Sequence, residues 1–150
     1  MTHQDLTRQV LMRHESASCG RFGRMNILLV EDSSEVSCIT VEYLHELGHS
    51  VAAVPEAELA IAKLGEESFD AVMTDVRLPG MSGIELARAL TKSHPTMPVV
   101  IASGYGTLNV ELMMGEKSRT VLMLPKPYDL DALAKTLNDA ANIRKPALTP

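Results

Sequence analysis

The sequence predicts an α/β fold in which helices cover both faces of one parallel sheet, giving three layers. Two observations favour this fold. From residue 25 onward, short aliphatic and β-branched runs alternate with longer stretches in which apolar residues recur every three or four positions, which is the pattern of repeated strand–helix–strand units. The predicted strands are also apolar at nearly every position, as expected for strands that are buried on both faces.

Length and composition fit one ordinary domain. The chain has 150 residues, of which 45% are hydrophobic and 22% charged, so a buried core is expected. The net charge of −5 argues against broad binding to nucleic acid or to anionic membranes. Cys19 and Cys38 fit no disulfide framework or zinc spacing, and no apolar run approaches the ~18 residues that span a bilayer. We therefore expect a cytoplasmic protein without membrane association.

Three segments are expected along the chain. Residues 1–24 hold four arginines and two acidic residues, so this segment differs in charge from the acidic remainder. We expect it to be a poorly ordered N-terminal arm. Residues 25–144 form the patterned domain, and residues 145–150 form a C-terminal tail.

The first half of the domain contains two strand–helix units. A strand at residues 26–30 precedes an amphipathic helix that ends at Gly48. A second strand at residues 50–54 precedes a helix that begins at Pro55 and ends near Gly65. The positions expected to face the core are Val36, Ile39, Thr40, Tyr43, Leu44 and Leu47 in the first helix, and Leu59, Ala60, Ala62 and Leu64 in the second.

The second half continues the alternation. A strand at residues 71–74 leads through a turn at residues 79–83 into a helix that is closed before Pro95. A strand at residues 98–102, a short helix at 107–114, a strand at 120–124 and a last helix ending near Arg144 follow. The expected core positions of the two longer helices are Ile84, Leu86, Ala87 and Leu90, and Leu130, Leu133, Ala134, Leu137 and Ala141.

Polar residues stand where the predicted strands end. Glu31 and Asp32 follow the first strand, Asp75 the third, Ser103 the fourth and Lys126 the fifth. The carboxyl ends of parallel strands meet at one edge of a sheet, and ligands bind there in open α/β folds. We therefore expect these five side chains to lie close together.

These residue types suit phosphoryl chemistry. Three carboxylates in one place repel one another unless a cation joins them or their pKa values rise, and an all-oxygen site with few carboxylates suits Mg²⁺. With that charge screened, one carboxylate can attack a phosphoryl group and form an aspartyl phosphate; Asp75 is the best placed. Lys126 and Ser103 offer an ammonium and a hydroxyl for the phosphoryl oxygens.

The chain resembles the receiver domain of two-component response regulators, of the stand-alone or hybrid-kinase type. The resemblance covers about residues 25–144 and rests on four motifs in order, which are ILLVEDS at 27–33, DAVMTDVRLPGMSG at 70–83, Ser103-Gly104 and Lys126-Pro127. It implies a flavodoxin-like doubly wound sheet of five parallel strands in the order 2-1-3-4-5, with five helices.

The resemblance also implies roles for the acidic residues. Asp75 would accept a phosphoryl group from a histidine kinase or a histidine phosphotransfer protein. Mg²⁺ would be held by Asp32, Asp75 and the backbone carbonyl of Arg77, and Glu31 would reach it directly or through water. The domain would then be no enzyme in its own right, since it promotes only its own phosphorylation and dephosphorylation.

Further roles follow from the same resemblance. Ser103 takes the position of the family's switch hydroxyl, and Lys126 that of its invariant lysine, whose bond to Pro127 is usually cis. The domain would signal by contact with a downstream protein and would not bind DNA itself, and a homodimer is compatible with this reading. Because no output domain follows the last helix, we expect a stand-alone receiver or the detached receiver of a hybrid kinase.

Three other functions are weighed against this one. Haloacid-dehalogenase-like phosphatases need a second Asp two residues after the nucleophile, where this chain has Arg77. A flavodoxin-like nucleotide or flavin binder would place a phosphate beside Glu31 and Asp32, which would repel it unless a metal intervened. The remaining alternative is a pseudo-receiver, an interaction module that keeps the fold without phosphorylation, and the retention of every acid, Ser103 and Lys126 argues against it.

Overall fold

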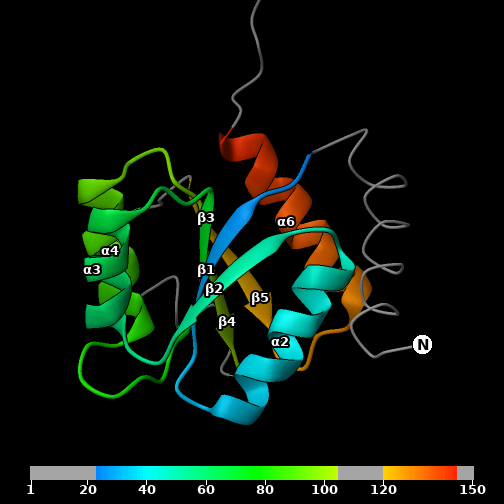
Figure 1. Cartoon of the computed structure of the whole chain (residues 1–150), viewed down its shortest axis with the longest axis horizontal. Coiled ribbons are helices and arrows are strands. Elements are labelled where there is room, and N and C mark those ends of the chain that lie inside the picture. Colours follow the sequence, from blue (N-terminus) through cyan, green and yellow to red (C-terminus); the bar gives the residue numbers. More distant parts are fainter. Residues whose placement is uncertain (1–22, 105–119, 145–150) are drawn as a thin grey trace, which may run out of the picture.

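The computed structural model describes residues 23–104 and 120–144 (Figure 1). In this part of the chain, five parallel strands form one sheet in the order β2-β1-β3-β4-β5, which confirms the predicted flavodoxin-like topology. The strands are β1 (Asn26–Val30), β2 (Ser50–Val54), β3 (Ala71–Asp75), β4 (Val99–Ser103) and β5 (Val121–Pro125), and the helices are α2 (Ser34–Glu46), α3 (Ala57–Glu66), α4 (Gly83–Ser93) and α6 (Leu130–Arg144). The arm, the tail and the fifth helix predicted at residues 107–114 lie outside the described residues, apart from Gly23 and Arg24.

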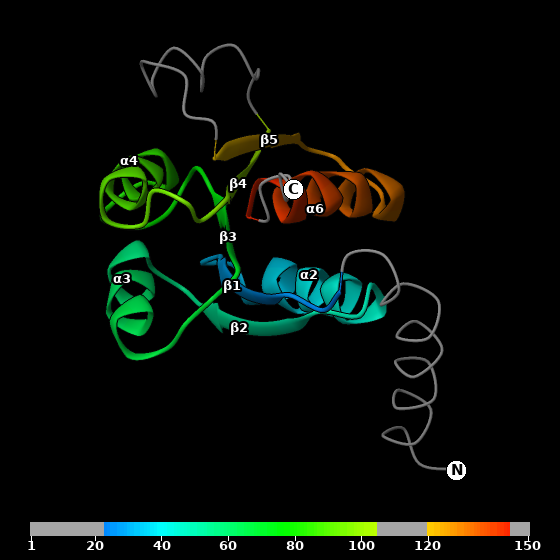
Figure 2. The same ribbon diagram turned by 90° about the horizontal axis from the view of Figure 1, so that it is seen from above.

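The sheet separates two apolar cores. Helices α2 and α6 cover one face of the sheet, and α3 and α4 cover the other (Figure 2). In β1, Ile27 and Leu29 belong to the core under α2 and α6, whereas Leu28 and Val30 belong to the core under α3 and α4. This alternation follows from the two-residue period of a strand, and it explains why the central strands are apolar throughout.

Helix α2 buries less of its apolar face than its periodicity predicts. Its buried residues are Thr40 and Leu44, while Val36 and Ile39 are 37% and 51% exposed. The helix lies at the outer part of the sheet, where β2 is the edge strand. The sheet therefore covers only a narrow stripe of the helix, and the prediction that Val36 and Ile39 lie in the core is wrong.

Helix α3 shows the same effect on the opposite face. Ala57 and Ala60 are fully buried, but Leu59 is 45% exposed and Ala62 is exposed. The prediction that Leu59 and Ala62 face the core is therefore wrong, because α3 too lies beside the edge strand. In the other two helices, the buried positions include Ile84, Leu86, Ala87, Leu90, Leu133, Leu137 and Ala141 as predicted.

Serine caps start the two helices that follow β1 and β3. The Ser33 side chain accepts the N–H of Val36 at 3.4 Å at the start of α2. Ser82 and Glu85 form a capping box at the start of α4, in which each side chain accepts the backbone N–H of the other. Both helices thus begin close to the carboxyl ends of the strands.

Within the described residues, no helix combines the length and the apolarity that a membrane crossing requires.

Candidate functional site

The carboxyl ends of four strands bring the predicted site residues to one edge of the sheet. Glu31 and Asp32 directly follow β1, Asp75 ends β3, Ser103 ends β4 and Lys126 directly follows β5. The parallel register pairs Asp75 with Ala102 and Ser103 with Pro125. The expected convergence is therefore a consequence of sheet topology and holds for all five residues.

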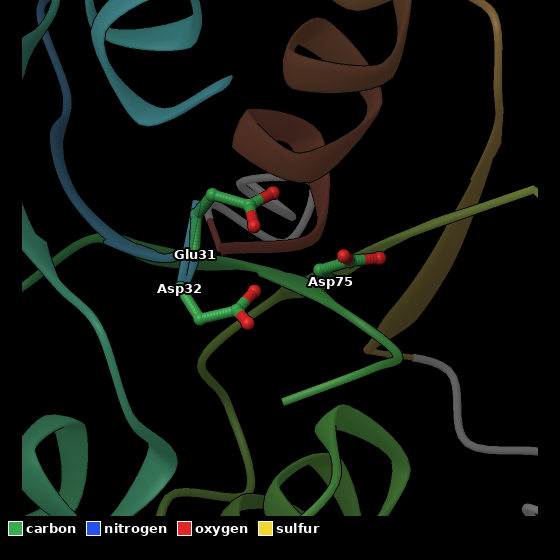
Figure 3. Close-up of side chains that lie close together, drawn as sticks. All are labelled: Glu31, Asp32 and Asp75. Carbon is green, nitrogen blue, oxygen red and sulfur yellow. The ribbon is translucent and has the colours of Figure 1, made fainter. Parts of the chain in front are cut away.

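Three carboxylates form an acidic cluster at this edge. One oxygen each from Glu31, Asp32 and Asp75 lies within 4.8 Å of the others, and the side chains gather around one space (Figure 3). Glu31 is buried, Asp32 is exposed and Asp75 is half-buried. Oxygen ligands at this spacing, open on the side of Asp32, fit a hard divalent cation such as Mg²⁺ that keeps some of its water.

Lys126 joins this cluster from the neighbouring strand. Its Nζ atom lies 3.4 Å from Oδ1 of Asp75 and 3.9 Å from Oε1 of Glu31. The backbone N–H of Lys126 donates to the carbonyl oxygen of Ser103 at 2.8 Å, so the ends of β4 and β5 are tied together. The Lys126–Pro127 peptide bond is cis, as the resemblance implied.

Burial is the main influence on the pKa of Glu31. Burial raises this pKa above its usual range, while the N–H of Ser33, which donates to Oε2 at 3.1 Å, opposes the rise. The charge of Asp75 and a hydrogen bond with Asp32 raise the pKa further, and the Lys126 ammonium lowers it. A cation bound close to Glu31 would therefore stabilise its charged form and lower its pKa.

A pocket of about 310 Å³ opens beside Asp75. Its lining residues are Asp75, Val76, Arg77, Ser103, Gly104 and Lys126. Ser103 is buried and Arg77 is exposed. The pocket therefore combines a carboxylate, an ammonium and a hydroxyl, which are the groups needed to accept a phosphoryl group and to bind its oxygens.

Two further residues lie against Asp75, although the sequence analysis assigned them no role in the site. The hydroxyl of Thr74 donates to the carbonyl oxygen of Asp75 at 2.9 Å, and the α-carbon of Gly83 lies so close that a Cβ there would overlap the same oxygen. A hydroxyl directly before the acceptor residue in an otherwise apolar strand was the available signal for Thr74. The approach of Gly83 has no such signal, because it depends on how α4 packs.

Solved structures of receiver domains share this fold. A response regulator receiver domain protein from Clostridium thermocellum is 31% identical, with a TM-score of 0.68, and the match covers 80% of this chain and 96% of that one. The receiver domain of the sensor histidine kinase PA1611 from Pseudomonas aeruginosa is 23% identical, with a TM-score of 0.69, over 80% of this chain and 99% of that one. The second likeness shows the fold alone; that structure has a magnesium ion coordinated in its active site cleft.

Curated relatives are regulatory proteins that are longer than this chain. The transcriptional regulatory protein TcrA of Mycobacterium tuberculosis is 31% identical over 121 residues, which are 81% of this chain and 47% of TcrA. The luminescence regulatory protein LuxO of Vibrio campbellii is 33% identical over 118 residues, which are 78% of this chain and 25% of LuxO. The chain thus spans about half or less of these relatives.

A family-wide comparison agrees with the topology and the acidic edge. The sequence pattern described as the response regulator receiver domain matches residues 27–138, which run from β1 into α6 and include every predicted site residue. The match covers most of the chain. This chain therefore belongs to the response regulator receiver domain family of two-component signalling systems.

Proposed function

We propose that Asp75 of this receiver accepts a phosphoryl group from the phosphohistidine of a histidine kinase or a histidine phosphotransfer protein, with Mg²⁺ bound beside it. The observation that carries the proposal is the position of Asp75, which belongs to the acidic cluster, pairs with Lys126 and lines an open pocket. Of the three clustered acids, Asp75 is the one that lines this pocket. Its carboxylate is therefore the one that a phosphoryl group could approach.

The proposed transfer makes one bond and breaks one bond. A carboxylate oxygen of Asp75 attacks the phosphorus, and the bond between phosphorus and the imidazole nitrogen breaks. The electron pair of that bond stays on the nitrogen. Lys126 supplies a positive charge for the phosphoryl oxygens from its place 3.4 Å from Oδ1 of Asp75. The hydroxyl of Ser103, which lines the same pocket at the end of β4, supplies a hydrogen bond to them.

Mg²⁺ would be held by Asp32, Asp75 and the backbone carbonyl of Arg77, with Glu31 reaching it directly or through water. The carboxylate oxygens within 4.8 Å of one another support this assignment, and so does the position of Arg77 in the loop that follows β3 and lines the pocket. Bound Mg²⁺ would neutralise the charge of the carboxylates and of the incoming phosphoryl group.

The output is proposed to be a protein contact made by the domain in the cytoplasm, by a monomer or a homodimer, without DNA binding by the domain. The curated relatives are regulatory proteins, and this chain matches only part of each. The net charge of −5 does not suit a DNA-binding surface. The domain is further proposed to promote only its own phosphorylation and dephosphorylation.

Mass measurement of the intact protein tests this function. The protein is incubated with acetyl phosphate or with a phosphorylated histidine kinase, with Mg²⁺ or with EDTA. Wild type and the control Asp139→Asn, which changes a half-exposed carboxylate of α6, should gain one phosphoryl group. Asp75→Asn and the EDTA sample should not.

Three outcomes would count against the proposed function. A stable phosphoryl group on Asp75→Asn at the wild-type rate, or a reaction that is indifferent to EDTA, would show that the assignment is wrong. No phosphorylation of the wild type by either donor would favour the pseudo-receiver.

A further inference from the structure

Thr74 is a fully buried polar residue next to the proposed phosphoacceptor. In β3, Met73 belongs to the core under α2 and α6 and Val72 to the core under α3 and α4. Side chains alternate along a strand, so Thr74 faces α4. A hydroxyl buried there is unfavourable unless it forms a hydrogen bond, and its Oγ1 donates to the carbonyl oxygen of Asp75 at 2.9 Å.

This hydrogen bond is linked to the Asp75 carboxylate through the rigid peptide group that joins Asp75 and Val76. The carbonyl of Asp75 and the N–H of Val76 belong to the same peptide group, which is planar and points the two in opposite directions. The N–H of Val76 donates to Oδ1 of Asp75 at 2.8 Å. Fixing the carbonyl therefore fixes the N–H, and the N–H in turn holds Oδ1, the oxygen that lies 3.4 Å from Lys126.

Helix α4 packs against the carbonyl side of this peptide group. The N–H of Gly83 donates to the carbonyl oxygen of Val76 at 2.9 Å. A Cβ on Gly83 would overlap the carbonyl oxygen of Asp75 and would lie 3.1 Å from Oγ1 of Thr74. The first residue of α4 thus packs directly against the hydroxyl–carbonyl pair, and this close contact leaves little room for the peptide group to turn.

We propose that Thr74 is a positioning residue, whose hydroxyl fixes the plane of the Asp75–Val76 peptide and thereby the orientation of the Asp75 carboxylate. Its effect on phosphorylation rests on the proposed function, whereas its effect on the carboxylate does not. Without the hydroxyl, the peptide turns more freely and Oδ1 occupies the productive place for less of the time. One hydrogen bond of ordinary strength predicts a roughly three- to tenfold slower phosphorylation of Asp75.

The test uses variants that separate the hydroxyl from the fold. Thr74→Val removes the hydroxyl at nearly constant volume, and Thr74→Ser keeps it. Thr40→Val is a matched control, because Thr40 is also buried and its hydroxyl donates to the carbonyl oxygen of Val36 at 2.8 Å within α2. Two quantities are measured for each variant: the amide proton shift of Val76 in the unphosphorylated protein, and the initial rate of phosphorylation by acetyl phosphate at saturating Mg²⁺.

Thr74→Val should move the Val76 amide proton upfield and slow the phosphorylation, Thr74→Ser should restore both, and Thr40→Val should change neither. Wild-type values of both quantities in Thr74→Val, or a Thr74→Ser variant as impaired as Thr74→Val, would overturn the proposal. If Thr74→Val does not fold, the pair Thr74→Ala and Thr74→Ser gives the same contrast, since both lack the methyl group. If wild type itself is not phosphorylated, the proposed function fails, and the Val76 amide shift still decides the role of Thr74.

Discussion

The Nζ atom of Lys126 lies 3.4 Å from Oδ1 of Asp75. The same ammonium is 3.9 Å from Oε1 of Glu31, so one cation offsets part of the repulsion between two clustered carboxylates. A divalent cation bound by these carboxylates would be repelled by the ammonium, while an incoming phosphoryl group would be attracted to it. Lys126 therefore acts in opposite directions on the two proposed ligands of the site.

Replacing Lys126 with methionine should strengthen Mg²⁺ binding and weaken phosphorylation. Loss of one positive charge close to the acidic cluster should raise Mg²⁺ affinity roughly three- to tenfold at low salt, less at high salt because the site is partly exposed. Isothermal titration calorimetry with Mg²⁺ measures this effect, and acetyl phosphate labelling measures the loss of phosphorylation. Lys135→Met is the control, since Lys135 pairs with Asp139 on the exposed surface of α6. Weaker Mg²⁺ binding in Lys126→Met would contradict the prediction.

Arg77→Ala should shorten the life of the phosphorylated state. Arg77 is exposed and lines the pocket beside Asp75, where its bulk would restrict the approach of water to an aspartyl phosphate. We expect a roughly two- to fivefold faster loss of the phosphoryl group, followed by mass after removal of the donor, with the exposed Arg88→Ala of α4 as the control. An unchanged decay would show that the Arg77 side chain does not shield the group.

Two glycine-to-alanine changes should have opposite effects on the free energy of unfolding. At Gly83 the new Cβ would overlap the carbonyl oxygen of Asp75, so Gly83→Ala should destabilise the domain by about 1–3 kcal/mol and slow phosphorylation. At Gly65, in α3, a Cβ would meet nothing within 4 Å, so Gly65→Ala should stabilise it by about 0.5–1 kcal/mol. Urea unfolding of both variants decides the matter. Equal effects would mean that α4 does not pack against Asp75 as described.

His49 should make the stability of the domain depend on pH. Burial lowers the pKa of His49, the Arg24 charge lowers it further and Asp70 opposes them, while the Nδ1 atom accepts the N–H of Met25 at 3.1 Å. The unfolded chain takes up a proton at about pH 6.5, and the folded chain does so only at lower pH. The contribution of His49 is therefore complete above about pH 6.5 and is lost as the pH falls through the folded-state pKa.

His49→Asn provides the test, because its side-chain oxygen can accept the Met25 N–H in place of Nδ1 and its amide does not titrate. Urea unfolding at about pH 7.5 and about pH 5.5 should show a smaller loss of stability on acidification in His49→Asn than in wild type. Carboxylates that lie away from His49 contribute equally to both proteins, so they cancel in the comparison. The same loss in both proteins would contradict the assigned role.

The sequence by itself determined the order of the elements and the residues at the edge of the sheet. Strand and helix periods are local properties, and the site residues stand at the ends of four strands or directly after them, as with Asp75 at the end of β3 and Lys126 directly after β5. Because parallel strands place their carboxyl ends on one side, the convergence of Glu31, Asp32 and Asp75 could be predicted without knowing any distance. The strand order came from the family resemblance, and the structure confirms it.

Only the tertiary structure decided how completely each face is covered and which backbone groups touch. Periodicity identifies an apolar stripe on a helix, but the width of the stripe that the sheet covers depends on its neighbours, and for this reason Ile39 and Leu59 are exposed beside the edge strand. The contact of Thr74 and Gly83 with the Asp75 carbonyl likewise joins a strand to a helix across the intervening loop. Such contacts depend on small differences in distance between groups separated in the chain, and residue types alone do not specify them.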